Sequence, residues 1–194
     1  GFSHQTAERD QEMRDYFTTA KIKETLAECE SQGINTFLGR CDNHICRVLH
    51  EYWREGGAIQ WFAQTAPEMA SLEQNLRQAG HYGARGCYLQ GSQTQRMWEA
   101  KDFEAIARFL DQVRAQGIAA GLASHAPDVL LDLAGRGVMP DFYMVCFYNV
   151  TGHKGDILRH AQGEAYPRED REAAVAAMRR LDRPSTRPRN TDRG

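Results

Sequence analysis

The chain has 194 residues, of which 41% are hydrophobic and 26% charged, and its formal net charge is −2. This composition is that of a globular protein and excludes collagen-like, coiled-coil and wholly disordered chains. No apolar run approaches the roughly 20 residues that span a membrane, no secretory signal opens the chain, and the near-neutral charge argues against nucleic acid as a partner.

The predicted elements alternate between helices and short apolar strands along the chain. We predict helices over residues 18–32, 42–54, 67–76, 102–115, 127–134 and 169–181, and strands over 34–38, 58–63, 86–89, 118–123 and 141–147. Thr18 supplies a capping hydroxyl for the first helix, and Pro67 is placed where its missing N–H costs nothing. Asp42, Thr65 and Ser124 are further candidates for N-caps.

The strands are near-continuous apolar runs, which is typical of a parallel sheet covered on both faces or of a barrel wall. Two architectures fit this pattern, a doubly wound open sheet and part of a (β/α)₈ barrel. The glycines form neither of the phosphate-binding fingerprints of nucleotide-binding sheets, which favours the barrel. The predicted fold class is therefore α/β, a partial (β/α)₈ TIM barrel containing about strands 2–6 with their helices.

We predict one barrel-like domain over residues 1–182 and a disordered basic tail over 183–194. A complete barrel needs about 250 residues, so this domain is predicted to be incomplete, with its first strand before residue 1 and the tail where the seventh strand belongs. The chain has five cysteines, an odd number at low density, which indicates reduced thiols and a cytoplasmic protein.

Polar residues follow each predicted strand, at the edge where both architectures bind ligands. Arg, Asp, Asn, His, Gln and Ser side chains in this position suit a small polar or carbohydrate-like substrate. The candidate substrate-binding residues are His4, Arg40, Asn43, Gln90, Ser124 and Asn149. The candidate catalytic residues are His44, His125 and Asp42, with either histidine as general acid or base. Arg40 would hold an anionic or hydroxylated group.

Two other kinds of chemistry stay open. A metal site could gather His4, Asp42, His44 and His125 from separate loops, although the spaced cysteine pairs of a structural zinc site are missing and no metal ligands are assigned. Cys41 could act as a nucleophile if His44 served as its base.

Three segments resemble the aldo-keto reductase-type barrel, and the similarity covers most of residues 18–149. "GINTF" at 33–37 resembles the second barrel strand, "GLASHAPDVLLDL" at 121–133 the fifth strand with its helix, and "DFYMVCFYN" at 141–149 the sixth strand. Residues 1–4 resemble the segment after the first strand. The resemblance implies an oxidoreductase with NADP(H) as cofactor.

The departures from this family concern its catalytic residues. Leu38 stands where the reductases have an Asp, the Tyr that follows is missing, Gln64 and Thr65 end the third barrel strand without a Lys, and Leu89 and Gln90 end the fourth without a His. Ser124 and His125 replace a Ser-Asn pair that contacts the nicotinamide. The resemblance therefore implies a branch that lacks the reductase tetrad and acts on a small polar substrate. The alternatives are a metal-assisted isomerase or lyase on the same barrel, and a non-catalytic fragment that needs a partner or forms a homo-oligomer.

Overall fold

The computed structural model describes residues 6–69, 71–147 and 168–181, and within them five strands form one parallel sheet. The strands are β1 (Thr36–Arg40), β2 (Gln60–Gln64), β3 (Gly86–Leu89), β4 (Ala119–Ser124) and β5 (Phe142–Val145). Their spatial order follows the chain, β1-β2-β3-β4-β5. A doubly wound sheet reverses strand order at a switch point, and the described sheet contains no such reversal. The architecture is therefore an α/β half-barrel.

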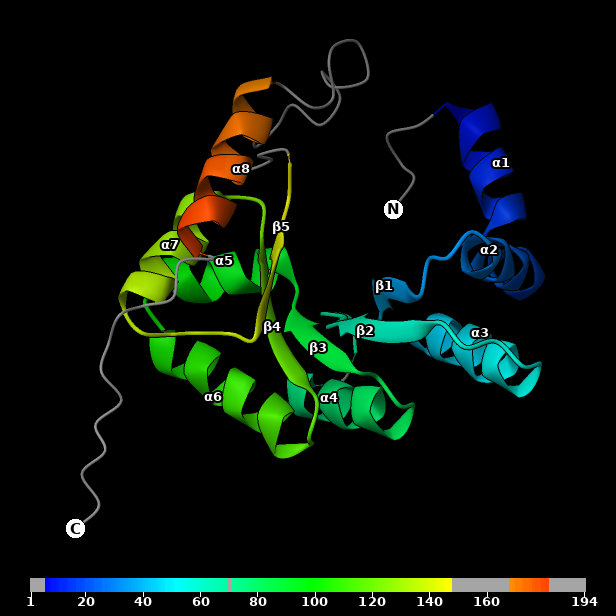
Figure 1. The fold of residues 1–194 in the computed structure, drawn as a ribbon, viewed down its shortest axis with the longest axis horizontal. Helices are drawn as coiled ribbons and strands as arrows, with labels where there is room; N and C mark the ends of the chain where they lie inside the picture. The colour runs from blue at the N-terminus through cyan, green and yellow to red at the C-terminus, as the bar shows by residue number, and fades with distance from the viewer. Residues whose placement is uncertain (1–5, 70, 148–167, 182–194) are drawn as a thin grey trace.

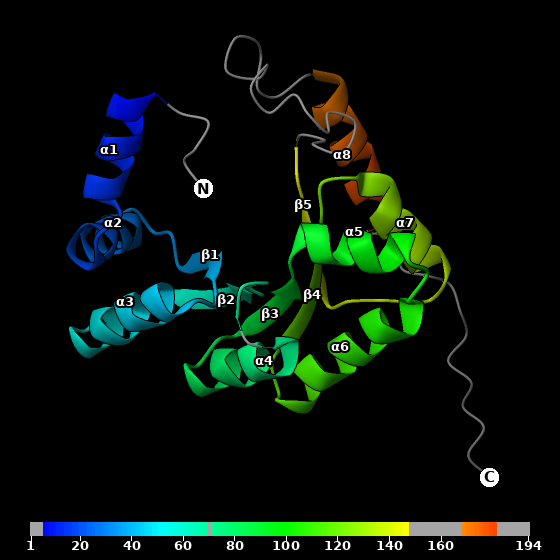
Figure 2. The same cartoon turned by 180° about the vertical axis from the view of Figure 1, so that it is seen from behind.

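The helices are α1 (Ala7–Tyr16), α2 (Thr19–Ser31), α3 (Asn43–Arg54), α4 (Leu72–His81), α5 (Gly91–Glu99), α6 (Phe103–Ala115), α7 (Pro127–Gly135) and α8 (Arg168–Leu181). Helices α2 to α8 lie on the outer, convex side of this curled sheet, whereas α1 extends beyond α2 (Figure 1). The reverse view shows the same arrangement, with α3, α4 and α6 along the outside of the strands (Figure 2). α6 packs on β3 and β4, and α8 packs on α7.

The hydrophobic core lies between the outer face of the sheet and these helices. Trp61 on β2 and Leu122 on β4 are completely buried there, against helical residues such as Leu49 of α3 and Leu110 of α6. The inner face is more open, since Leu38 on β1 keeps 44% of its surface exposed. The convex face of the sheet is thus buried under the helices, whereas the concave face is partly exposed to solvent.

The curl of the sheet brings together aromatic side chains from distant strands. The rings of Phe62 on β2 and Phe142 on β5 meet edge to face with centroids 5.1 Å apart. In a flat sheet three strand spacings would separate them by about 14 Å. A methyl group on Gly86 or Gly121, the glycines of β3 and β4, would lie 2.7 Å and 2.3 Å from these rings respectively. Glycine at both positions therefore makes room for the contact.

The structure confirms all five predicted strands and moves some of their boundaries. β1 begins two residues later than predicted, so Arg40 is its last residue rather than part of a loop. The predicted helix start at Pro67 is wrong, because Ser71 is the N-cap of α4 and its side chain accepts from the Gln74 N–H. The caps at Thr18 and Asp42 are confirmed.

Two helices, α1 and α5, were not predicted. α1 has no buried residue, and in α5 only Gly91 and Thr94 are buried. Helix prediction depends on apolar residues that recur at helical spacing. α1 has no such repeat, and the apolar residues that α5 packs against the core, Met97 and Trp98, are adjacent in the chain. The predicted tail over residues 183–194 lies outside the described residues. Within the described ranges, no helix is both long and apolar enough to cross a membrane.

Candidate functional site

One residue from each strand forms a row across the concave face of the sheet. Arg40 is opposite Gln64, Gln64 opposite Tyr88, Tyr88 opposite Gly121, and Gly121 opposite Phe142. Residues directly opposite one another project from the same face of a sheet. The first three, at the carboxyl ends of β1, β2 and β3, are called here the polar row.

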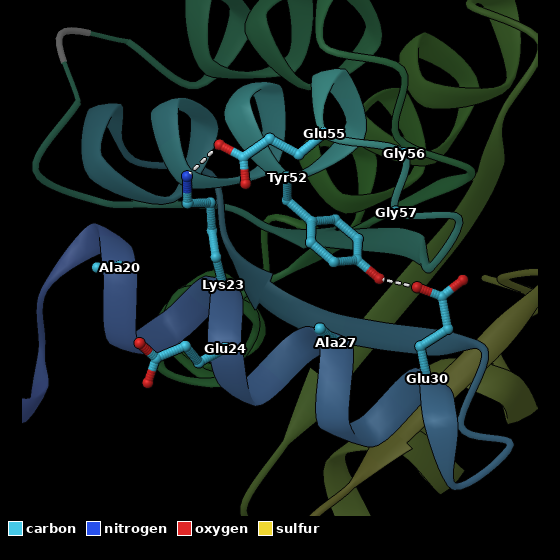
Figure 3. Close-up of a pocket in the computed structure, with 9 residues that line it drawn as sticks. All are labelled: Ala20, Lys23, Glu24, Ala27, Glu30, Tyr52, Glu55, Gly56 and Gly57. Atoms are coloured by element: carbon cyan, nitrogen blue, oxygen red, sulfur yellow. Dashed lines mark hydrogen bonds and ion pairs between the residues drawn. The ribbon is translucent and has the colours of Figure 1, made fainter.

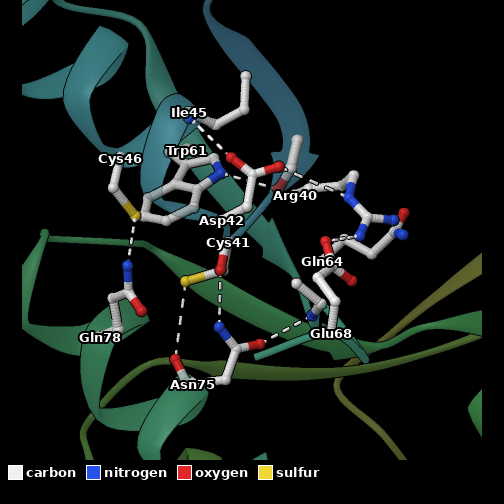
Figure 4. A network of polar contacts seen from close by, with 12 residues as sticks. Arg40, Cys41, Asp42, Ile45, Cys46, Trp61, Gln64, Glu68, Asn75 and Gln78 are labelled. Carbon is white, nitrogen blue, oxygen red and sulfur yellow. Dashed lines mark hydrogen bonds and ion pairs between the residues drawn. The ribbon is translucent and has the colours of Figure 1, made fainter. Parts of the chain in front are cut away.

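The arginine of the polar row lies between two carboxylates (Figure 4). Its Nη2 donates to Glu68 Oε1, and its Nε is 3.6 Å from Asp42 Oδ2. Glu68 belongs to the segment between β2 and α4, whereas Asp42 directly follows β1. The hydrogen bond from Arg40 lowers the pKa of Glu68, so this carboxylate stays charged over a wider pH range.

A hydrogen bond joins the side chains of the other two members of the polar row. The Tyr88 O–H donates to Gln64 Oε1 at 3.2 Å. Tyr88 is almost completely buried, and burial raises its pKa to about 12, so it remains a neutral phenol at physiological pH. The polar row therefore places a guanidinium, an amide and a buried, protonated phenol side by side, and the phenol holds the Gln64 amide in position.

A second group of polar residues follows β2 and β3 at the same edge. The Thr65 O–H donates to Gln93 Oε1 at 2.7 Å, while Thr65 Oγ1 accepts from the Gln90 N–H at 2.9 Å. Thr65 thus joins the end of β2 to the start of α5 and does not cap a helix. The Gln90 Oε1 accepts from the Ser92 O–H at 2.5 Å. These bonds hold Gln90 at the carboxyl edge of the sheet, close to the polar row.

A buried asparagine holds the chain segments that follow β1 and β2 (Figure 4). The Asn75 Nδ2 donates to the Cys41 carbonyl at 2.7 Å, and its Oδ1 accepts from the Ala66 N–H at 2.8 Å. Asn75 is on α4 and only 1% exposed. It therefore ties together the backbone next to Arg40 and the backbone leading to Glu68.

The predicted catalytic residues occupy three different environments. Asp42 Oδ1 accepts from the Ile45 N–H at 2.8 Å, so this carboxylate caps α3 while its other oxygen faces Arg40. His44 points toward α2, with Nε2 3.4 Å from Thr19 Oγ1 and its ring against Phe17. The structure thus places Asp42 beside Arg40 and directs His44 away from both.

His125 directly follows β4 and is half-buried. A methyl group on Gly91, the first residue of α5, would lie 3.3 Å from His125 Cδ2, so the imidazole packs over the start of that helix. Burial lowers the pKa of His125. The neutral imidazole therefore dominates at physiological pH, which is the form that can accept a proton.

The predicted substrate-binding residues also separate into groups. Arg40 and Gln90 lie at the carboxyl edge as predicted, whereas Asn43 is exposed on α3 and accepts from Gln78 Nε2 at 3.2 Å. Ser124 is completely buried, and its hydroxyl bonds the backbone N–H and carbonyl of Ala126 at 3.0 and 2.9 Å. The remaining two, His4 and Asn149, lie outside the described residues.

The structure does not pair Cys41 with His44. Cys41 is completely buried, and its Sγ–H donates to the Asn75 carbonyl at 3.6 Å. The hydrogen bond with the Cys46 thiol and burial both raise the pKa of Cys41, which opposes formation of a nucleophilic thiolate. In the described ranges, no three His, Cys, Asp or Glu side chains gather as metal ligands would.

A groove of about 530 Å³ lies between α2 and α3 (Figure 3). Lys23 there pairs with Glu55 at 2.5 Å and Glu51 at 3.3 Å, and the Tyr52 O–H donates to the Glu30 carboxylate. These contacts run between α2 and α3 and hold the two helices together. We therefore assign the groove to helix packing and place the candidate site at the carboxyl edge of the sheet.

Comparisons with protein-family models, curated proteins and solved structures find no match for this chain. Of the residues that build the edge, sequence reasoning missed Gln64, Tyr88, Glu68 and Asn75. Tyr88 lies within an apolar run, and Glu68 and Asn75 reach the edge only through the placement of α4. Of these four residues, only Gln64 carried a signal in the sequence, because it is a polar residue directly after the predicted strand 58–63.

Proposed function

We propose that the concave face of this half-barrel binds a small polar, hydroxylated ligand at the carboxyl ends of β1, β2 and β3. The single observation that carries the proposal is the polar row, in which Arg40, Gln64 and Tyr88 face the same side in register. Barrel enzymes bind their substrates at this edge. Together the side chains of the polar row supply both donors and acceptors of hydrogen bonds, which suits a ligand rich in hydroxyl groups.

The Phe62–Phe142 pair adds an apolar surface to the same concave face. Residue 62 lies one layer below the polar row on β2, and Phe142 continues the row on β5. Sugars and related polyols carry both hydroxyl groups and apolar C–H faces, so a carbohydrate-like ligand would use both parts of the site. A binding site that combines a few placed polar groups with aromatic side chains is the usual composition of a ligand pocket.

We propose further that the protein is an aldo-keto reductase-like barrel enzyme whose chemistry differs from that of the reductases. His125 follows β4 at the edge that carries the site, and its neutral imidazole would serve as general base. Asp42 caps α3 and faces Arg40, so it would orient Arg40 instead of moving a proton. His44 has no part in this proposal, because it contacts α2.

The described residues do not fit a nicotinamide held in the manner of the reductases. That contact would need the serine that ends β4, and the Ser124 hydroxyl both donates to and accepts from the Ala126 backbone. The serine is also completely buried. We therefore derive no step that involves NADP(H).

Replacing Arg40 with alanine should abolish most of the ligand affinity. A hydrogen bond to a charged group contributes about 1.5–3 kcal/mol, so its loss should raise the dissociation constant by about ten- to hundredfold. The measurement is saturation-transfer NMR against neutral sugars, polyols, sugar acids and small dicarboxylates, followed by titration of any ligand found.

Arg77→Ala is the matched control, because Arg77 forms a comparable exposed ion pair with Glu73 on α4. It should bind the ligand as the wild type does. Equal affinity of the Arg40 and Arg77 variants would contradict the proposed site. If no compound binds and the chain sediments as a dimer, an interaction module becomes the better description.

That second candidate function has one observation in its favour. The exposed large apolar side chains of the described residues gather at the two edges of the half-barrel. They are Ile34 and Leu38 at β1, Tyr16 and Phe17 at the end of α1 on the same side of the fold, and Met139, Phe147, Val175 and Met178 around β5 and α8. Exposed apolar surface beside an edge strand is typical of a protein that associates with another chain.

A further inference from the structure

The charge around Arg40 is already compensated within the protein. One guanidinium faces two carboxylates, those of Asp42 and Glu68, so the local net charge is −1. Arg40 and Glu68 are both partly exposed, with 40% and 54% of their side-chain surfaces accessible. A ligand that approaches Arg40 therefore also approaches Glu68.

We propose that Glu68 determines the charge selectivity of the site, so that the site accepts neutral hydroxylated ligands and rejects anions. This inference rests on the proposed function and specifies its ligand class. A ligand carboxylate near Arg40 would be close to two like charges, which is unfavourable at a partly exposed surface. A neutral hydroxyl group meets no such repulsion and can accept from the guanidinium and donate to a carboxylate.

The two carboxylates are not equivalent as targets for a test. Asp42 Oδ1 caps α3 by accepting from the Ile45 N–H, so its replacement would also weaken the helix. The Glu68 carboxylate, in contrast, pairs with Arg40 and caps no helix in the described part of the chain. Glu68→Gln keeps the size of the side chain and an acceptor oxygen for Arg40, and removes only the charge.

Sorbitol and gluconate form a suitable pair of probes, because both are open-chain six-carbon compounds and only gluconate carries a carboxylate. We expect the wild type to bind sorbitol more tightly than gluconate. In Glu68→Gln the ratio of the two dissociation constants should shift by about fivefold or more toward gluconate. The shift should shrink at high salt, since screening weakens interactions between exposed charges.

Glu73→Gln is the matched control, because Glu73 is an exposed partner of an arginine on α4, away from the edge. It should leave the ratio unchanged. Tighter binding of gluconate to the wild type, or the same ratio in Glu68→Gln, would overturn the inference while the binding site itself stands. Failure of the wild type to bind either probe or any compound of the panel would instead overturn the proposed function.

Discussion

Trp61→Ala should destabilise the protein by about 3–5 kcal/mol, the range found when a fully buried large aromatic side chain is truncated. Trp61 is completely buried between β2 and the outer helices, and its Nε1–H donates to the Gly39 carbonyl of β1 at 3.0 Å. The variant therefore leaves a large cavity and removes a bond between neighbouring strands. The measurement is urea unfolding followed by circular dichroism.

Two further variants separate these contributions. Trp61→Phe keeps most of the volume and loses the hydrogen bond, so it should cost only about 1–2 kcal/mol. Trp53 also donates its indole N–H to a backbone carbonyl, that of Ile59 at 3.0 Å, but it is only partly buried. Trp53→Ala should therefore cost less than Trp61→Ala. The reverse order would contradict the placement of Trp61 in the core.

Asn75→Ala should destabilise the protein by about 2–4 kcal/mol, because each buried polar group left without a partner costs about 1–3 kcal/mol. The variant would leave the Cys41 carbonyl and the Ala66 N–H without the hydrogen bonds that Asn75 makes to them, at 2.7 and 2.8 Å respectively. Ligand affinity should fall as well, since these backbone groups hold the segments that carry Arg40 and Glu68. The measurements are urea unfolding and the ligand titration described above.

Asn43→Ala provides the control for this result. Asn43 is exposed and accepts one hydrogen bond, from Gln78 Nε2 at 3.2 Å, so the variant should change stability by no more than about 0.5 kcal/mol. An Asn75 variant as stable as the Asn43 variant would mean that the loops after β1 and β2 are held by other contacts.

The sequence predicted most of the fold because its buried elements carry strong periodic signals. The stripe of Ile45, Val48 and Leu49 identified α3, and Asp42 was correctly expected to cap it. α1 was missed because it has no buried residue, and α5 because the apolar side chains that it packs against the core, Met97 and Trp98, are adjacent and form no helical repeat. The order of the strands could not be derived from the elements themselves, since a doubly wound sheet uses the same alternation of strand and helix.

The candidate site was harder to predict, because its residues come together only through the register of the strands. Arg40 was selected as a polar residue after the first strand, but its contact with Glu68 depends on how the segment between β2 and α4 is placed. Ser124 was selected by the same rule and is buried in a local turn. A polar residue after a strand thus has two outcomes, ligand contact or backbone pairing, and the sequence does not separate them.

The concave face exists only if the sheet curls as described, and the contact between Phe62 and Phe142 tests this most directly. Their ring centroids are 5.1 Å apart, although β3 and β4 lie between their strands. A NOESY spectrum of protein with labelled phenylalanine should show a cross peak between the two rings, and this peak should disappear in Phe142→Leu. Assigned rings that give no cross peak in a folded protein would contradict the half-barrel and the site built upon it.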